Sequence, residues 1–258
     1  MPFPNYPSKY ESEALLTPQD MLAYRRRLGR LPDIEPPLSV ILCLQRGLPE
    51  RLRWRYPIRK AGRLIGDLYL LKRSGGKVGV LTNFGLGAPL IVALAEELIA
   101  WGVKRLISLS LSAGLQPELK PGDIVVCERA LRDEGVSHHY LPPEKFVQAD
   151  RQLVLDLVKA LEGLGESFSI GATWSIDAPY RETRDEVQQY QTEGIKTAEM
   201  ETAGLLAVAQ VRGVQAASVL VVGDSLSGLR WELPPDPRPA ERRIEAAYAA
   251  VVKALGAG

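Results

Sequence analysis

Short apolar runs alternate with amphipathic segments along most of the chain. Apolar runs of strand length occupy residues 38–44, 104–112, 123–132, 171–176 and 216–224. Two further runs, 67–72 and 77–82, flank Gly75-Gly76 and predict a hairpin. Segments with one apolar face predict helices at 89–98, 151–165, 184–193, 200–213 and from 239 onward. Strands that alternate with helices in this way predict an α/β fold with a largely parallel sheet.

The first 38 residues differ from the body of the chain. Thr17, Pro18 and Asp20 are typical of a helix start, because they supply an N-cap, a first-turn proline and an acid three positions after the cap. Prolines between residues 32 and 37 then interrupt the chain. We therefore expect an N-terminal extension with one helix over residues 1–38 and a single α/β domain over residues 39–258.

Two acidic residues stand where an apolar, alanine-rich helix is expected to begin. Glu199 and Glu201 flank Met200, and the strand that follows this helix ends at Asp224. In open α/β sheets the carboxyl ends of the strands form the ligand-binding edge, so this pattern predicts a site there. Simpler roles remain open, because the helix macrodipole favours acids at a helix N-terminus and an aspartate can serve as a cap.

Composition narrows the classes of function. The 258 residues carry a net charge of +1, with 46% hydrophobic and 24% charged residues. A nearly neutral chain produces no strong electrostatic field that would attract nucleic acid or a membrane surface, so we expect neither partner. No apolar run reaches the roughly 18 residues of a membrane span, and Met1–Pro7 lacks the pattern of a signal peptide. Cys43 and Cys127 lie singly in apolar runs, which is typical of free thiols in the cytoplasm, where we expect this protein.

Two glycine-containing loops follow predicted strands. Gly85 and Gly87 precede a helix, where backbone N–H groups can hold an anion. The segment from Gly47 to Arg51 offers backbone donors and a guanidinium group, which suit a phosphate. Both segments also fit ordinary turns. Gly85-x-Gly87 lacks the third glycine of a dinucleotide fingerprint, and no cluster with metal-ligand spacing occurs, so we expect neither a dinucleotide nor a metal.

Taken together and in this order, the segments resemble the nucleoside phosphorylase family, which comprises purine nucleoside and uridine phosphorylases and related nucleosidases. The resemblance covers about residues 39–256, and Glu199-Met-Glu201 is its most specific part. Segments similar to the family's phosphate loop, second glycine loop, Gly-Asp-Ile-Val segment and nucleoside-pocket wall are 47–51, 83–89, 112–126 and 175–180. The resemblance implies a single-domain, three-layer α/β fold with a mixed, largely parallel central sheet flanked by helices.

The resemblance implies a nucleoside pocket with a sugar side and a base side. Glu201, Met200 and Glu199 match the ribose side, where a carboxylate accepts hydrogen bonds from the sugar hydroxyls. Tyr180 matches a residue that lines the pocket beside the base. Asp224 matches the acid that purine-specific members place at N7 of the leaving base, which makes it the expected catalytic residue.

A phosphate side is also implied. Residues that match the family's phosphate ligands or their surroundings are Gly47, Arg51, Gly85 and Ser112. Arg242 follows the proline-rich loop 232–239, at the place where purine enzymes of six subunits carry an arginine partner to the catalytic acid. We therefore expect Arg242 to act with Asp224 in catalysis.

The phosphate side departs from the family pattern. Leu48 replaces the aspartate of the first loop, and Ser108 stands near the place of the usual phosphate arginine, a strong charge-assisted ligand. The arginine that a neighbouring subunit donates is not identifiable, and Arg59 and Arg63 are only candidates. Ser112-Ala-Gly114 is more similar to the matching segment of nucleosidases that use water, although their water-activating glutamate is absent.

We therefore expect a nucleoside phosphorylase that uses phosphate as co-substrate, needs no cofactor, and converts a purine ribonucleoside to free base and ribose 1-phosphate. Residues 134–143 resemble the uridine branch, so a uridine phosphorylase is the first alternative. A phosphate-independent nucleosidase and a non-catalytic nucleoside-binding homologue also remain open. The family implies a homo-oligomer built from dimers, up to a hexamer.

Overall fold

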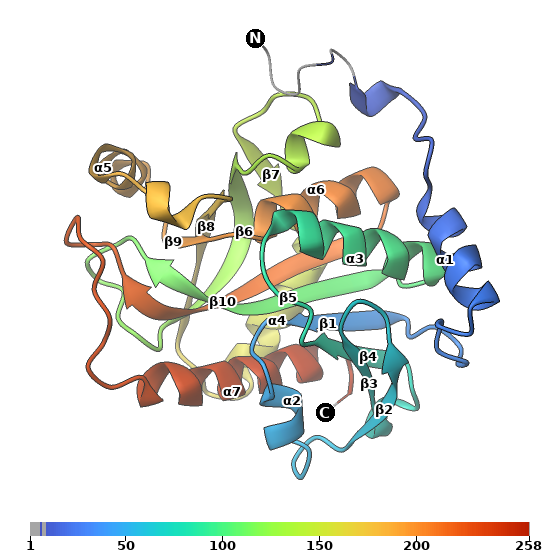
Figure 1. Cartoon of the computed structure of the whole chain (residues 1–258). Coiled ribbons are helices and arrows are strands. Elements are labelled where there is room, and N and C mark those ends of the chain that lie inside the picture. Colours follow the sequence, from blue (N-terminus) through green and yellow to red (C-terminus); the bar gives the residue numbers. More distant parts are fainter. Residues whose placement is uncertain (1–5, 7–8, 258) are drawn as a thin grey trace.

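A computed structural model describes residue 6 and residues 9–257 of the chain (Figure 1). The opening segment Met1–Pro7, from which we expect no signal peptide, lies outside the described residues except for Tyr6. The fold is a layered arrangement of one large sheet and helices on both of its faces (Figure 1).

Ten strands form the sheet. In chain order they are β1 (Ser39–Cys43), β2 (Ile58–Arg63), β3 (Asp67–Leu71), β4 (Val78–Thr82), β5 (Arg105–Gly114), β6 (Ile124–Asp133), β7 (Phe146–Gln148), β8 (Phe168–Ile176), β9 (Thr197–Glu199) and β10 (Gln215–Ser225). Strands β4, β1, β5 and β10 are neighbours and run parallel to one another. The predicted hairpin is confirmed as the antiparallel pair β3 and β4.

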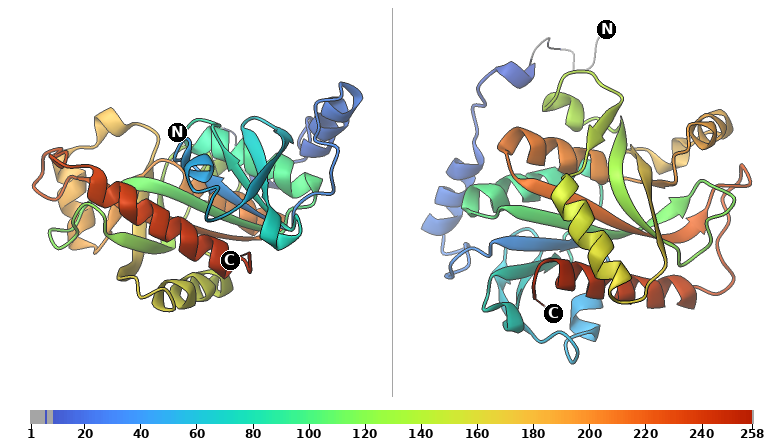
Figure 2. Two further views of the ribbon diagram at one scale, coloured as in Figure 1. Left: turned by 90° about the horizontal axis from the view of Figure 1, so that it is seen from below. Right: turned by 180° about the vertical axis from the view of Figure 1, so that it is seen from behind.

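Helices cover both faces of the sheet. They are α1 (Pro18–Arg27), α2 (Leu48–Arg51), α3 (Ala88–Trp101), α4 (Arg151–Glu162), α5 (Arg184–Thr192), α6 (Thr202–Arg212) and α7 (Arg238–Ala254), with short 3₁₀ turns η1 (Lys9–Glu11), η2 (Lys72–Ser74), η3 (Ser137–His139) and η4 (Pro179–Arg181). Helices α3 and α6 lie on one face, and α4 and α7 on the other (Figures 1 and 2). The predicted α/β class with flanking helices is confirmed.

Strand alternation explains the two faces. In β1, Val40 and Leu42 pack with α3 and α6, whereas Ile41 and Cys43 point to the α4–α7 side. Both faces are therefore apolar, which is why strand β1 is entirely buried and reads as a continuous hydrophobic run. Because both layers bury apolar side chains, the sheet lies at the centre of the molecule.

Five strands close into a ring. Strand β10 pairs with β5 on one side and with β6 on the other. Strand β6 pairs with β8, β8 with β9, and β9 with β5, which completes the circle. A closed ring leaves these strands without a free edge. The carboxyl ends of β5 and β10 are thereby fixed next to β9.

The predicted N-terminal helix is confirmed as α1. Thr17 Oγ1 accepts a hydrogen bond from Asp20 N at 3.2 Å, and Asp20 Oδ2 accepts one from Thr17 N at 3.0 Å. This reciprocal pair is a capping box. Helix α1 packs against α3, where Arg25 forms an ion pair with Glu97 at 2.9 Å. The proposed division into an extension and a domain at residue 38 stays a prediction.

Three strands were not predicted. Strand β2 carries Arg59, Lys60 and Arg63 and has no regular apolar alternation. It pairs with β3 alone, so it is an edge strand whose charged side chains reach water. Strands β7 and β9 have three residues each, too few for a periodic pattern to mark them.

Candidate active site

A cavity of about 670 Å³ lies where strands β5, β9 and β10 end. Side chains from four segments far apart in sequence line it: 111–113, 179–187, 198–200 and 224–231. The predicted residues Ser112, Glu199, Met200, Tyr180 and Asp224 are all among them. The carboxyl edge of parallel strands is the usual ligand-binding edge of an α/β sheet, as expected from the sequence.

The ends of β5 and β10 meet through a bulge. Val222 pairs with Ser112, and Asp224 pairs with the next residue, Ala113, so that Gly223 is the extra residue of β10. A bulge bends its strand and redirects the side chains that follow. Asp224 and Ser112 therefore line the same cavity although they lie far apart in the sequence, because the pairing of β5 with β10 brings them together.

Both carboxylate oxygens of Glu199 accept hydrogen bonds from groups of the protein. Its Oε2 accepts hydrogen bonds from Glu201 N and Thr202 N, both at 2.8 Å, and from Thr202 Oγ1 at 2.8 Å. Its Oε1 accepts one from Ser175 Oγ. Burial raises the pKa of Glu199, and these hydrogen bonds oppose that shift. Glu199 therefore holds the start of α6, and its expected role on the ribose side stays a prediction.

Glu201 joins α6 to the second glycine loop. Its Oε1 accepts a hydrogen bond from Gly87 N at 2.5 Å, and its Oε2 accepts one from Met200 N at 3.3 Å. The side chain is buried, and burial together with the negative charge of Glu199 raises the pKa of Glu201 to about 7. A carboxylate has further lone pairs, so these two bonds leave acceptor capacity for ribose hydroxyls.

Met200 and Tyr180 occupy different depths of the cavity wall. Met200 is partly buried between the two glutamates. Tyr180 belongs to η4 and is 99% exposed, so its ring has almost no contact with the rest of the protein. Tyr180 thus lies at the mouth of the cavity, and its expected contact beside the base stays a prediction.

Ser112 is a buried hydroxyl that the protein leaves unsatisfied. The residue is 5% exposed, and its Oγ has no hydrogen-bond partner among the described residues. Buried polar groups are nearly always paired, so an unpaired one on a cavity wall is a candidate ligand contact. Ser108, four positions earlier on the same face of β5, instead forms a hydrogen bond with Ser218 of β10 and is buried.

Asp224 has an aromatic partner that sequence reasoning missed. Trp231 Nε1 donates a hydrogen bond to Asp224 Oδ2 at 2.6 Å. The loop after β10 brings Trp231 back because Ser225 and Glu232 pair with each other in a short antiparallel bridge. One oxygen of Asp224 is therefore already used as an acceptor.

A second carboxyl lines the same cavity as Asp224. Glu182 follows η4 and is partly buried. Burial raises the pKa of Glu182 to about 7, and the negative charges of Asp224 and Glu186 add to that shift. No sequence pattern marks this residue, since it lies in a polar run between η4 and α5.

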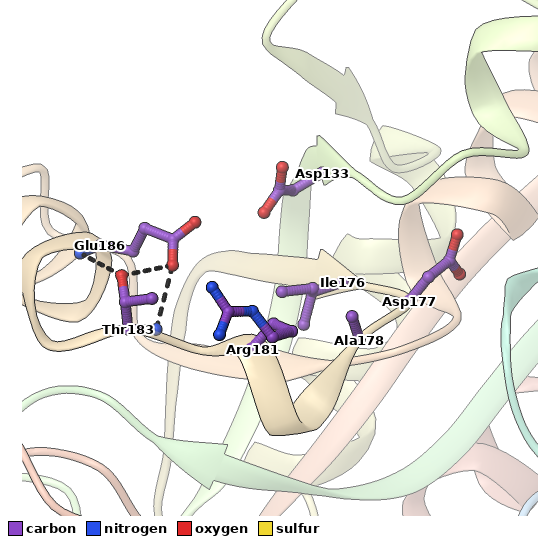
Figure 3. A pocket seen from close by; sticks show the side chains of 7 residues that line it. All are labelled: Asp133, Ile176, Asp177, Ala178, Arg181, Thr183 and Glu186. Atoms are coloured by element: carbon purple, nitrogen blue, oxygen red, sulfur yellow. Dashed lines mark hydrogen bonds between the residues drawn. The ribbon is translucent and has the colours of Figure 1, made fainter.

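A separate hollow of about 390 Å³ lies beside this segment (Figure 3). Its walls include Asp133, Arg181, Thr183 and Glu186, and Figure 3 shows Arg181 pointing into it. Glu186 Oε2 accepts hydrogen bonds from Thr183 N at 3.0 Å and Thr183 Oγ1 at 2.6 Å, which cap helix α5. Glu186 is thus used structurally.

The first glycine loop lies apart from the cavity. Gly47 has the left-handed φ of 70° and begins α2, so the predicted turn at 47–51 is a short helix. Arg51, at the end of α2, lies 3.8 Å from Glu245 of α7, and its side chain is about half exposed. Neither residue lines the cavity with Ser112. The expected phosphate role of Gly47 and Arg51 stays a prediction.

Gly85 also lies outside the cavity lining. Its φ of 99° favours glycine, and it shapes the loop whose next glycine, Gly87, contacts Glu201. The candidate arginines Arg59 and Arg63 lie on β2, away from the cavity-lining segments.

Arg242 does not line the cavity that holds Asp224. Helix α7 begins at Arg238, which places Arg242 on the helical face shared by Glu245, Ala246 and Ala249. That face lines a different hollow of about 190 Å³ together with Arg55 and Glu166. The expected pairing of Arg242 with Asp224 stays a prediction.

Within the described residues, no helix is long and apolar enough to cross a membrane. No group of three or more His, Cys, Asp or Glu side chains is placed to hold a metal ion in that part of the chain. The cytoplasmic location stays a prediction.

Comparison with known proteins identifies the family. The model of the Phosphorylase superfamily matches residues 56–255. Uridine phosphorylase of Escherichia coli (strain K12) is 27% identical over 173 residues, which cover 62% of this chain and 68% of that protein. Guanosine phosphorylase of Halorubrum lacusprofundi is 29% identical over 181 residues, covering 69% of this chain and 75% of its own.

A solved structure shows the same fold. The crystal structure of uridine phosphorylase from Vibrio fischeri ES114 superposes with a TM-score of 0.75 and 23% identity, covering 86% of this chain and 92% of that chain. The resemblance seen in the sequence is thus confirmed, as is the expectation of an enzyme of this family. The chain belongs to the Phosphorylase superfamily.

Proposed function

We propose that this protein is a nucleoside phosphorylase that cleaves the N-glycosidic bond of a purine ribonucleoside with phosphate, giving free base and ribose 1-phosphate. The observation that supports this most is that Ser112, Met200 and Asp224 line one cavity. Glu201 does not line it but accepts a hydrogen bond from the main-chain N–H of Met200. Sugar-side and base-side residues thereby face one volume.

Each side has a chemical task. Glycosidic cleavage builds positive charge on the ribose and negative charge on the departing base. Glu201 orients the ribose through its hydroxyls, and Met200 packs against the sugar. Glu199 holds the start of α6, and with it Glu201, in place. Tyr180 covers the rim, and Asp224 interacts with the base.

Phosphate enters from the side of Ser112. Its unpaired hydroxyl supplies one hydrogen bond to the attacking anion. Two arginines, Arg184 and Arg230, line the same cavity and contribute positive charge. We further propose that the protein is a homo-oligomer built from dimers, in which a neighbouring subunit supplies the strong phosphate ligand that β5 lacks.

Uridine phosphorylase is the second candidate, because the Escherichia coli and Vibrio fischeri proteins carry that name. The guanosine phosphorylase of Halorubrum lacusprofundi favours a purine. Asp224 decides our preference, since an acid near the base suits N7 of a purine, an acceptor.

One assay separates the candidates. Purified protein is incubated with inosine, guanosine, adenosine or uridine, with and without phosphate, and the release of base is followed. Phosphate-dependent release from the purine nucleosides supports the proposal, and from uridine alone it supports the second candidate. Phosphate-independent release identifies a nucleosidase. Binding without release identifies a non-catalytic homologue.

A further inference from the structure

Glu182 is a carboxyl of the cavity to which the mechanism above assigns no task. It lies on the wall formed by η4 and the start of α5, and Asp224 stands on the wall formed by β10. No hydrogen bond to its carboxyl group occurs among the described residues, whereas Glu186, one turn later, is used by Thr183. Glu182 is therefore free to contact a ligand.

The charged groups around Glu182 come from three elements. Asp224 and Arg230 approach from the β10 end, Arg184 and Glu186 from α5, and Glu199 from β9. Burial and the charges of Asp224 and Glu186 raise the pKa of Glu182 to about 7. Near neutral pH, a proton on Glu182 removes the repulsion between two carboxylates that line one cavity.

Asp224 already has a partner within the protein. Trp231 Nε1 donates a hydrogen bond to its Oδ2 at 2.6 Å, so that oxygen acts as an acceptor. The carboxyl of Glu182 lines the same cavity and has no such partner among the described residues, so both of its oxygens are open to a ligand. Geometry thus gives the two acids different tasks.

We propose that Glu182 is a catalytic residue that gives its proton to the departing base, while Asp224 acts as its neighbouring carboxylate. This inference rests on the proposed function. As the C1′–N9 bond of a purine nucleoside breaks, its electron pair moves into the base and N7 takes the proton from Glu182. A phosphate oxygen forms the new bond to C1′. Glu182 is left as a carboxylate, and solvent restores its proton.

The test is the pH dependence of kcat/KM for inosine phosphorolysis. The wild-type rate should fall as the pH rises through about 7, where Glu182 loses its proton. Glu182→Gln keeps the size of the side chain but cannot give up a proton in this way. The kcat/KM of this variant should be lower by about 10²–10⁴-fold at pH 6, and the fall in rate as the pH rises through about 7 should be absent.

Asp185→Asn is the matched control, because Asp185 is an exposed acid of the same segment that does not line the cavity. It should keep the wild-type rate and profile. The pKa of Glu201 is also raised to about 7. The fall in rate is therefore assigned to Glu182 only if wild type shows it and Glu182→Gln does not. Circular dichroism confirms that each variant is folded.

A binding measurement gives a second readout. Trp231 lies at the cavity, so its fluorescence reports binding of free hypoxanthine at pH 6 and pH 8. Wild-type protein should bind the base more tightly at pH 6, and Glu182→Gln should lose this difference. A folded Glu182→Gln variant with the rate, profile and base binding of Asp185→Asn overturns the proposal. If wild type releases no base from any nucleoside with phosphate, the proposed function itself has failed.

Discussion

The main-chain N–H of Gly87 donates a hydrogen bond to Oε1 of Glu201 over 2.5 Å. The glycine loop at the start of α3 thus holds an anion, as its pattern predicts, but this anion is a carboxylate of the protein itself. The contact ties the N-terminus of α3 to that of α6. It holds the carboxylate of Glu201, the proposed ribose acceptor, through a main-chain N–H group rather than a side chain.

Glu201 should make stability depend on pH. Its pKa is about 7 in the fold, against an ordinary value of 4.5. Because the folded pKa is the higher one, this group's stabilising contribution is complete below about pH 4.5 and is lost as the pH rises to about 7. Glu201→Gln should therefore flatten the fall in unfolding free energy between pH 5 and pH 8, measured by urea denaturation.

The control for that experiment is Glu162→Gln, at the exposed end of α4. It should retain the wild-type pH dependence. An unchanged slope in Glu201→Gln would show that Glu201 ionises in the fold as it does in the unfolded chain.

Asp224→Ala should lower turnover of purine nucleosides by about 10²–10⁴-fold, the usual range for a group that assists proton transfer. The loss follows because Glu182 then has no neighbouring carboxylate and the base has no contact on the β10 wall. Steady-state rates with inosine measure it. Asp236→Ala, an exposed acid of the proline-rich loop that pairs with Arg238, should stay at the wild-type rate. Equal rates in both variants would remove Asp224 from the mechanism.

The Trp231→Phe variant should distinguish the effect of the indole N–H group from the effect of the aromatic ring. Phenylalanine keeps an apolar ring at the cavity but removes the donor to Asp224 Oδ2. We expect a loss of roughly tenfold in kcat/KM, equivalent to about 1.4 kcal/mol and in the range of one hydrogen bond to a charged group. Stability should change little, because Trp231 is 64% exposed. Full activity in this variant would mean that the indole contact does not affect Asp224 during turnover.

Ser112→Ala should raise the KM for phosphate about fivefold, the effect of losing one hydrogen bond of about 1 kcal/mol. Thermal unfolding should be nearly unaffected, since the hydroxyl has no partner among the described residues. Ser169→Ala is a matched control, because Ser169 Oγ also lacks a partner there but belongs to β8 and does not line the cavity. A phosphate KM that is the same in both variants would place the anion elsewhere.

The sequence was informative where short motifs decide the structure locally. Thr17, Pro18 and Asp20 predicted the start of α1, and Glu199-Met-Glu201 marked the ligand-binding edge. The apolar runs predicted the central strands because both faces of the sheet are covered. In each case the signal lies within a few residues.

Other parts of the site depend on distant contacts. Trp231 reaches Asp224 only because of the bulge at Gly223 and the pairing of Ser225 with Glu232. Arg242 lines a different hollow from Asp224, and the proline-rich loop before α7 gives no means to predict from sequence where that helix begins. Glu182 became a candidate only because the fold places it in the same cavity as Asp224. Such relationships arise from packing, which periodicity and spacing do not record.

The closed ring of β5, β10, β6, β8 and β9 limits how a substrate can enter. Strands joined all round by hydrogen bonds cannot separate without breaking a whole ladder, so their amides should exchange with deuterium only in global unfolding. Entry and release must then depend on the two wall segments outside the ring, 179–184 and 226–231. These are also the segments that carry Glu182 and Trp231, so the opening of the cavity and the chemistry at the base are coupled.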